Sequence, residues 1–529
     1  MTQTTGVRPR VASCAAMFLI VALLPVLAGR LDAQNSQGTI LGHVQDSSGA
    51  ALPKANVTAT NVNTNVAHHF TTTGQGDYVF VDIIPGTYQV KVEANGFKTE
   101  ISSGLTLEVD QTLRQNFSLE VGQIKEEMTV SADAQMVQTD NTTTGTVLDQ
   151  KTIEELPSSG RDFNNLVGLS TGAANFSGGS QVDFALHGLN TSFTEVSVNG
   201  ARPDSVSFMV DGVADTDNFF TTASGLPSEF AIQEVKVQTG LYSAEYGQGS
   251  GQINVAIKSG TNQYHGQAYD YIQNDMFFPR SPLALEQHLF EGAPVPTTTP
   301  YKQNQFGGTL GGPVKIPWLY NGQNKTFWFF AYDGGRRRTS PVQPAIQVPT
   351  AAERTGDFSD WPYQLYDPST TVGNDPTTRA TLASNQIPSG EINAMGQKLA
   401  NLYPLPNITC ALPCGNYLVP IHQSVTTNNE TFRVDQNFGD RNRFYFTGNV
   451  RGDDEPNPSM LPYTGSVNFA RAQLYGFNWE RSINANTINT ARIGYNHLFF
   501  STNSDTAYGP DLQAQLGFQN SPQAAALFG

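Results

Sequence analysis

The residues that could carry chemistry in this chain are few and scattered. Asp211, Asp215 and Asp217 are close enough in the sequence to suggest a calcium loop. They lack the glycine at position 6 and the glutamate at position 12 of an EF-hand, so we interpret them as loop acids on a domain surface. The glycine-rich stretch 247–252 (GQGSGQ) has no phosphate-loop lysine. No HExxH or Ser/His/Asp motif occurs, and the sequence predicts no catalytic residue, metal or cofactor.

Cys410 and Cys414 are the second chemical feature, and they flank a short ALP segment. An even pair in an exported protein favours a local disulfide. Two free thiols in a loop are the alternative, and a metal site is less favoured because no second cysteine pair or histidine cluster accompanies them. The adjacent His68 and His69 would point to opposite faces of a strand, so we expect both at the surface.

The composition favours exposed strands. The 529 residues include 46 Asp or Glu and 30 Lys or Arg, which gives a formal net charge of −16. Charged residues are only 14% of the chain, and 49 glycines and 10% aromatic residues replace them. A chain this acidic does not suit general nucleic-acid binding. Its aromatic content is too high for an acidic disordered chain.

The N-terminus is typical of a secretory signal. Arg8 and Arg10 precede an apolar run over 15–28, which is too short for a membrane-spanning helix. Cleavage could follow Ala28; we favour cleavage between Ala33 and Gln34, so that residues 1–33 are removed. An N-terminal membrane anchor is the alternative. No later stretch resembles a transmembrane helix, so any membrane segment would have to be a closed β-barrel.

Residues 34–120 form the first predicted domain, a β-sandwich. Short alternating segments such as 87–94 (TYQVKVEA) are separated by Ser48-Gly49, Pro85-Gly86 and Asn95-Gly96 turns. The segment resembles the carboxypeptidase-regulatory-like domain, which implies a prealbumin-like or carbohydrate-binding-like fold and no peptidase activity. The resemblance is carried by Gly42-His43-Val44 with Asp46, 52–57, Gly76-Asp77-Tyr78 with Phe80, and Pro85-Gly86-Thr87-Tyr88.

Residues 121–132 form a linker (VGQIKEEMTVSA). Its last seven residues, Glu126, Glu127, Met128, Thr129, Val130, Ser131 and Ala132, resemble the TonB box of TonB-dependent outer-membrane transporters. The resemblance implies pairing with periplasmic TonB by strand addition, which needs only an exposed backbone and alternating side chains. An ordinary edge strand or linker would satisfy the same pattern.

Residues 133–262 resemble the plug domain of TonB-dependent receptors of the Oar-like group, with α+β structure. A short helix is expected over 149–156. The resemblance is carried by Asn199, Gly200, Arg202, Val210, Asp211, Gly212, Val213, 232–235, Tyr242, Ser243, Ala244, Glu245, Tyr246, Gly247 and 258–262 (KSGTN).

Residues 263–529 are expected to form part of an antiparallel transmembrane β-barrel. Strands are predicted over 265–275, 301–311, 325–335, 430–438, 443–451, 472–482 and near 487–500, about the 9 to 11 residues of a membrane strand. In 443–451, apolar Phe444, Phe446, Gly448 and Val450 alternate with polar residues, as in outer-membrane strands.

The remaining segments of this region connect the strands. Trp328, Phe329, Phe330 and Tyr332 suit an aromatic girdle. Arg336-Arg337-Arg338 would follow that strand, either at lipid phosphates or in a solvated loop. Residues 311–325 would form a periplasmic connection, 439–442 a short hairpin, and about 339–429 a long extracellular loop with a helix near 389–402.

The strand count predicts an incomplete barrel. Roughly seven strands are recognisable, whereas plugged transporters need about 22 strands, or about 220 residues before loops. We therefore expect the chain to be a C-terminally truncated fragment that cannot transport anything alone, because an open sheet edge cannot sit in lipid.

The family resemblance implies an outer-membrane receptor or transporter of a Gram-negative-type bacterium, energised through TonB and its inner-membrane complex, with the sandwich in the periplasm. Its extracellular ligand stays open among siderophores, oligosaccharides, peptides and proteins. The alternative is an adhesion or structural protein of the outer membrane without active transport. The sequence indicates neither an enzyme nor a nucleic-acid partner.

Overall fold

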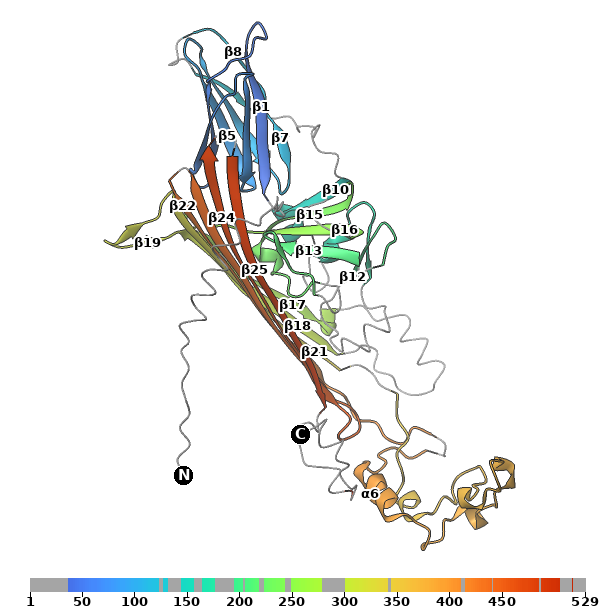
Figure 1. The fold of residues 1–529 in the computed structure, drawn as a ribbon. Coiled ribbons are helices and arrows are strands. Elements are labelled where there is room, and N and C mark those ends of the chain that lie inside the picture. The colour runs from blue at the N-terminus through green and yellow to red at the C-terminus, as the bar shows by residue number, and fades with distance from the viewer. Residues whose placement is uncertain are drawn as a thin grey trace, which may run out of the picture.

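The computed structural model describes residues 37–504 and Leu516, except 123–126, 132–143, 157–163, 177–194, 203–204, 218–222, 243–248, 278–299, 341–343, 411–413, 440 and 485–486. The predicted signal with Ala33 and Gln34, both ends of the TonB-box-like segment (Glu126 and Ala132) and the plug residues Glu245, Tyr246 and Gly247 lie outside the described residues. Figure 1 shows a sandwich at the top, a long tilted sheet below it and a smaller sheet against one face of the long one.

The N-terminal domain is a sandwich of two sheets. One sheet has the order β4-β1-β7, with β8 also pairing with β1, and the other has the order β3-β2-β5-β6-β9. The strands are β1 (Gly38–Asp46), β2 (Asn56–Asn61), β3 (Ala67–Thr71), β4 (Asp77–Ile83), β5 (Gly86–Glu93), β6 (Thr99–Leu107), β7 (Thr112–Arg114), β8 (Phe117–Leu119) and β9 (Glu127–Ser131). Tyr88, Val90 and Val92 of β5 are buried in the core, as their alternation predicts.

The TonB-box-like segment is an edge strand of this sandwich. β9 pairs in parallel with β6, with Glu127 opposite Thr99, Thr129 opposite Ile101 and Ser131 opposite Ser103. Among the described residues β9 has a strand on one side only. The backbone of the segment is therefore already in the extended form that strand addition requires.

The plug is a mixed five-stranded sheet in the order β10-β15-β16-β13-β14 with short helices and a separate β11–β12 pair. The elements are β10 (Thr144–Asp149), α2 (Gln150–Glu155), α3 (Asn164–Val167), β11 (Ala173–Phe176), β12 (Glu195–Val198), β13 (Val206–Val210), β14 (Val213–Ala214), η3 (Glu229–Ala231), β15 (Ile232–Gly240) and β16 (Gly251–Ile257). Asp149 caps α2, because its carboxylate accepts from Thr152 N at 2.9 Å.

The long sheet has seven strands that follow one another in chain order. They are β17 (His265–Asn274), β18 (Tyr301–Pro313), β21 (Thr326–Thr339), β22 (Gln423–Phe438), β23 (Asn442–Asn457), β24 (Ser466–Asn484) and β25 (Thr487–Ser504), with η5 (Asp275–Phe277) after β17 and a small hairpin of β19 (Lys315–Ile316) and β20 (Tyr320–Asn321) after β18. Within the described residues β17 and β25 do not pair, so the sheet is curved but not closed.

Several strands are longer than predicted. β22 to β25 have 16 to 19 residues, against an expectation of 9 to 11. The ends of these strands that lie away from the sandwich are rich in Asn, Thr, Asp and Glu. The backbone of these polar residues continues the hydrogen-bonded pairing with the neighbouring strands beyond the apolar band. For the same reason Arg336–Arg338 are not a loop but the end of β21; Arg336 donates to Thr427 O at 2.7 Å and lies 5.5 Å from the Phe306 ring centre.

The alternation predicted in β23 is confirmed. Arg443, Tyr445, Thr447 and Asn449 are buried on the plug side, whereas Phe446 is 37% exposed on the other face. The aromatic girdle needs one correction: Phe329 is 2% exposed and belongs to the core shared with the plug, while its neighbour Phe330 faces outward. Adjacent residues of a strand point to opposite faces, so Phe329 cannot face lipid together with Trp328, Phe330 and Tyr332.

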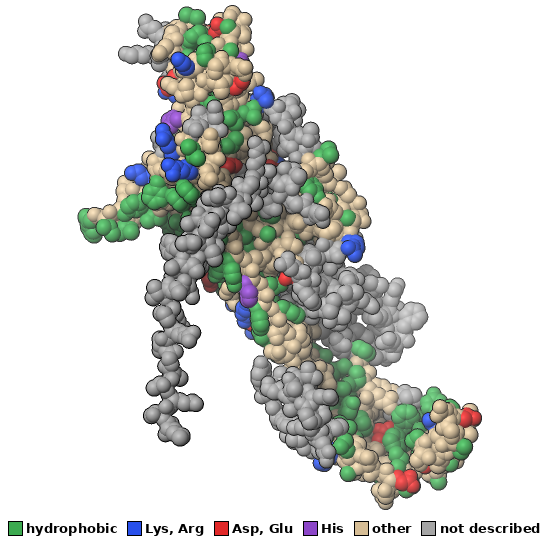
Figure 2. Space-filling view, in the orientation of Figure 1, with side chains coloured by type: hydrophobic (Ala, Val, Ile, Leu, Met, Phe, Trp, Pro, Cys, Tyr) green, Lys and Arg blue, Asp and Glu red, His purple; other side chains and the backbone are tan. Residues whose placement is uncertain are grey.

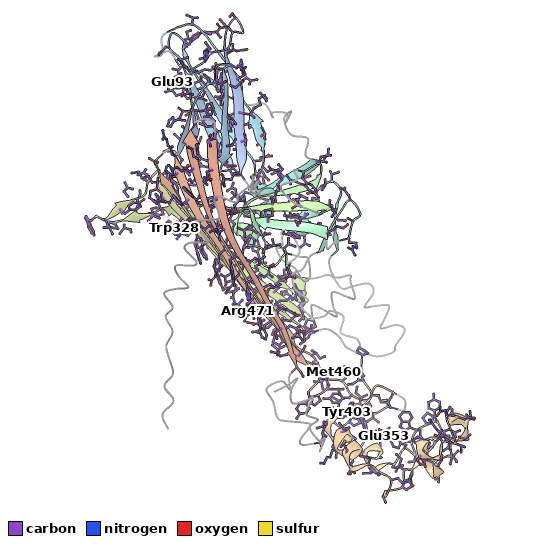
Figure 3. The ribbon with its side chains drawn as sticks, viewed as in Figure 1. Glu93, Trp328, Glu353, Tyr403, Met460 and Arg471 are labelled. Carbon is purple, nitrogen blue, oxygen red and sulfur yellow. A yellow bond between two sulfur atoms is a disulfide. The ribbon has the colours of Figure 1, made fainter. Side chains whose placement is uncertain are left out.

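The two ends of the long sheet differ. The hairpin between β22 and β23 is short, as predicted, and lies at the sandwich end, as does the β19–β20 hairpin (Figure 1). The segment 340–422 lies at the opposite end with α6 (Ala394–Leu402) and the turns η6 (Glu353–Thr355), η7 (Pro368–Thr370), η8 (Pro376–Thr378) and η9 (Ala383–Asn385). In Figure 3 the labelled Glu353 and Tyr403 lie there, far from Trp328 and Glu93.

Two smaller observations complete the fold. No helix among the described residues is both long and apolar enough to span a membrane. His69 is exposed, as predicted. The same prediction is wrong for His68, which is partly buried and lies near Arg443 of the long sheet. Burial lowers the pKa of His68 to about 4.

Candidate functional site at the contact of plug and long sheet

The segment Val210–Val213 forms a tight hairpin that aims one carboxylate at the long sheet. Val210 pairs with Val213, and the two residues between them have positive φ, 47° at Asp211 and 76° at Gly212. Asp-Gly is favoured in such type I′ turns because glycine and aspartate tolerate this conformation best. Asp211 Oδ1 accepts from Ile257 N at 3.1 Å, which fixes the carboxylate against β16.

Arg433 of β22 receives this carboxylate. Its Nη1 lies 3.2 Å from Asp211 Oδ2 and 3.1 Å from Ile257 O. Its Nε donates to Asp435 Oδ2 and its Nη2 donates to Asp435 Oδ1, each at 3.0 Å. Its guanidinium carbon lies 4.6 Å from the Tyr445 ring centre. This two-pronged geometry is the strongest form of an arginine–carboxylate pair. The buried guanidinium of Arg433 thus joins the plug to the long sheet.

Further buried groups extend the contact. Asp435 accepts from Ser259 Oγ at 2.8 Å and lies 3.4 Å from Arg443, which in turn lies 3.4 Å from Glu480. We call the set Asp211, Ser259, Arg433, Asp435, Arg443 and Glu480 the plug–barrel cluster. Gln37, just before β1 of the sandwich, donates to Glu480 and to the Tyr445 hydroxyl. Sandwich, plug and long sheet therefore meet at one charged centre.

The cluster borders a small cavity of about 80 Å³, lined by Gln37, Asn61, Asp211, Ser259, Arg433 and Tyr445 among others. Buried charges are tolerated when they are paired and hydrogen-bonded, and every charged member of the cluster has an opposite partner. The interactions of the cluster are electrostatic, and they join the plug to the long sheet.

The segment Lys258–Asn262 fastens the end of the plug on three sides. Lys258 Nζ contacts Glu154 of α2 and Phe230 O, the latter at 2.9 Å. Asn262 Nδ2 donates to Thr64 O of the sandwich and to Asn324 Oδ1 in the turn before β21, both at 2.6 Å. A Cβ added to Gly260 would lie 2.4 Å from Trp328 O, so only glycine lets the two backbones approach.

A second contact joins β15 of the plug to the β6–β7 turn of the sandwich. Glu234 accepts from Val109 N, and Lys236 Nζ donates to Asp110 O at 2.6 Å and Oδ2 at 3.2 Å. Burial raises the pKa of Glu234 to about 8. The predicted motif over 232–235 thus supplies a docking strand for the sandwich.

The other predicted plug residues do not join the plug–barrel cluster. Asn199 follows β12 with φ 54° and donates to Thr239 O. Gly200 comes next with φ 73°, and Arg202 is exposed. The Tyr242 hydroxyl donates to Gly249 O. These contacts fix turns inside the plug.

The interpretation of Asp211 and Asp215 as surface acids is wrong. They are 2% and 0% exposed, because the face that carries them is covered by the long sheet. Burial raises the pKa of Asp215 to about 7. Among the described residues no three His, Cys, Asp or Glu side chains are grouped to hold a metal ion.

Sequence reasoning missed the partners Arg433, Asp435 and Glu480. A signal was present: Thr431, Arg433 and Asp435 occupy alternate positions of one strand and so share its inward face. Nothing in the sequence pairs that face with Asp211, 222 residues earlier. In the segment 340–422, Cys410 and Cys414 form a disulfide.

The comparisons with known proteins agree with this architecture. The family described as outer membrane beta barrel domain matches residues 256–528, and the carboxypeptidase regulatory-like domain matches 39–120. The chain is 29% identical over 307 residues to the TonB-dependent transporter Oar of Myxococcus xanthus, which covers 55% of this chain and 26% of Oar. The chain thus spans about a quarter of the length of this curated relative.

Solved structures with a similar arrangement include the outer membrane transporter YddB of Escherichia coli, with a TM-score of 0.45 and 12% identity, covering 68% of this chain and 40% of that one. A ferric enterobactin receptor of Pseudomonas aeruginosa, PfeA, gives a TM-score of 0.36 and 13% identity over 67% and 40%. Since the first family match covers more than half of the chain, this protein belongs to the outer membrane beta barrel domain family and is an outer-membrane homologue of the TonB-dependent transporter Oar.

Proposed function

We propose that this protein is a TonB-dependent receptor that imports an extracellular ligand, with 126–132 as the segment on which TonB pulls. The observation that carries the proposal is the position of β9. It lies between the sandwich and the plug in the chain and has an extended backbone with one side unpaired among the described residues. TonB binding by strand addition needs these features.

We further propose that the sandwich lies in the periplasm and 340–422 outside the cell. Outer-membrane barrels have short periplasmic turns and long extracellular loops, and the sandwich lies at the end with the short turn over 439–441. This orientation argues against the adhesion alternative, since a periplasmic sandwich cannot touch an external surface.

In the proposed mechanism the plug–barrel cluster holds the plug at rest, and pulling on 126–132 separates the plug from the long sheet. The linker enters the plug at β10, whose neighbour β15 also carries the sandwich contact at Glu234 and Lys236. The proposal contains no covalent step and makes the protein a transporter and not an enzyme. The ligand class stays open among siderophores, oligosaccharides, peptides and proteins.

The test uses the full-length protein in its native host. A Met128→Cys variant should form a disulfide-linked adduct with a TonB that carries a cysteine in its periplasmic domain. Ser118→Cys, on an exposed position of β8, is the matched control and should not. Deletion of 126–132 should abolish ligand-dependent growth at unchanged protein level. Growth that persists without 126–132 and without TonB would contradict the proposal.

A further inference from the structure

The β19–β20 hairpin carries an unusual group of exposed apolar side chains. Trp318 is 104% exposed, Leu319 80%, Ile316 47% and Tyr320 38%. Figure 2 shows an apolar arm that projects sideways from the long sheet, at the end near the sandwich, and Figure 1 identifies it as β19. An exposed apolar group of this kind marks an interaction site.

The hairpin is held rigidly at its base. Gly322 N donates to Val314 O at 2.8 Å, Val314 N donates to Thr326 O at 2.9 Å, and Lys315 pairs with Asn321. Asn324 N donates a hydrogen bond to Asn262, which in turn donates a hydrogen bond to Thr64 O of the sandwich. Trp318 sits at the turn between the two strands, with φ 61°. The arm is a fixed projection of the barrel wall.

The arm continues the lipid-facing surface of an outer-membrane barrel. The outward residues of the adjoining strands, Leu310 of β18 and Phe330 of β21, are 50% and 39% exposed. At the same end of the sheet, Phe444 and Trp479 stack with ring centres 5.9 Å apart, and Phe438 packs on Phe444 at 5.5 Å. Aromatic residues at this position mark the boundary between head groups and acyl chains.

The charge of the arm fits an anionic lipid surface. Residues 312–332 contain Lys315 and Lys325 and no Asp or Glu, in a chain whose net charge is −16. Both lysines are exposed, as are Arg441 and Arg481 at the neighbouring strand ends. Basic residues beside tryptophan and leucine are typical of segments that lie in the plane of a membrane interface.

We propose that the β19–β20 hairpin is a membrane foot, in which Trp318 and Leu319 insert into the phospholipid leaflet on the periplasmic side of the outer membrane, beside the barrel. Lys315 and Lys325 contact the phosphate groups of that leaflet. The foot fixes the tilt of the barrel wall on the side where the sandwich and the linker are attached. This inference rests on the proposed orientation, with the sandwich in the periplasm, and not on TonB or on transport.

The experiment places a spin label on the hairpin of the full-length protein in vesicles of phosphatidylethanolamine and phosphatidylglycerol. Leu319→Cys is labelled in a Cys410→Ser, Cys414→Ser background, and Gln323→Cys, in the same connection but among polar residues, is the matched control. A label at 319 should collide more with lipid-soluble oxygen than with a water-soluble nickel chelate, and a label at 323 should show the reverse. Heat-modified migration on gels verifies that both variants fold.

Two outcomes would overturn the proposal. Greater collision with nickel at 319 than with oxygen would place the hairpin in water. Protection from both reagents would mean that protein covers it, either a second copy or a periplasmic partner. As a second measurement, Lys315→Gln with Lys325→Gln should make the label at 319 shallower in vesicles that contain phosphatidylglycerol. An unchanged depth would remove the role of the two lysines.

Discussion

Replacing Arg433 by methionine should loosen the plug without unfolding the barrel. Methionine keeps much of the side-chain volume but removes the guanidinium that contacts Asp211, Asp435 and Ile257 O. Asp211 and Asp435 are 2% and 1% exposed, so bulk solvent is largely kept from the two carboxylates. Breaking a buried ion pair by removing one partner costs about 3–5 kcal/mol.

The lower end of this range applies here. Asp435 keeps Ser259 at 2.8 Å and Arg443 at 3.4 Å, and Asp211 keeps the amide of Ile257. A cost of about 3 kcal/mol corresponds to roughly a 150-fold larger population of the open plug, since about 1.4 kcal/mol is a factor of ten. Amide hydrogens of β13 and β16 should exchange faster by about that factor, whereas those of β22 to β24 should change little.

The assay is hydrogen exchange with mass spectrometry on the full-length protein in detergent. Arg471→Met is the matched control, because its pair with Asp454 at 2.6 Å is about half exposed and contributes about 0–1 kcal/mol. Asp211→Asn in the Arg433→Met background should restore part of the protection, because it removes one uncompensated charge. Wild-type exchange in β13 and β16 of Arg433→Met, or equal acceleration by Arg471→Met, would refute the role given to the cluster.

Four further outcomes are expected. Asp215→Asn should stabilise the plug relative to the parent, and increasingly so as pH rises. In the parent the buried carboxyl keeps its proton up to a pKa of about 7, against 3.8 ordinarily, so the unfolded state loses its proton first. The free energy of unfolding of the parent therefore falls by up to about 4 kcal/mol between pH 4 and 7. Urea midpoints of parent and variant at several pH values would check this, and a constant gap would contradict it. Gly260→Ala should accelerate exchange in β16, because the new methyl group meets Trp328 O and Gly312 O, whereas Gly390→Ala, with open space around it, should not. Ile101 and Thr129 are register partners of β6 and β9, so the double variant Ile101→Cys, Thr129→Cys can link the two strands by a disulfide. If the linker must leave β6, ligand uptake should stop when this disulfide is oxidised and return when it is reduced. Equal uptake in both redox states would show that TonB acts with β9 in place. Cys410→Ser with Cys414→Ser should leave the thermal midpoint of the barrel nearly unchanged, since a five-residue ring restrains little chain entropy, but should speed proteolysis within 340–422.

Much of the fold was predictable from local pattern. The alternation of Tyr88, Val90 and Val92 identifies a sandwich strand, and that of Arg443 to Asn449 identifies a barrel strand with a polar inner face. Both follow from the two-residue period of a strand, which is a property of the backbone.

The lengths and environments of these elements were not predictable in the same way. β22 to β25 continue past the apolar band because each long strand pairs with the next, and pairing partners are invisible in a single segment. Phe329 faces the plug because register, and not residue type, decides its direction. Asp211 and Asp215, which look like loop acids, are buried because the long sheet covers them, and no local pattern announces that contact.

The sequence by itself determined which segments become strands and which residues share a face, because those properties depend on neighbours within a few positions. The tertiary structure decided which faces meet. Asp211 and Arg433 are 222 residues apart, β9 lies on β6 of the sandwich, and Asn262 links three parts of the molecule. Such contacts join groups whose separation along the chain carries no periodic signal. Only the folded chain shows that a hairpin turn, a barrel strand and the start of the sandwich form one charged centre.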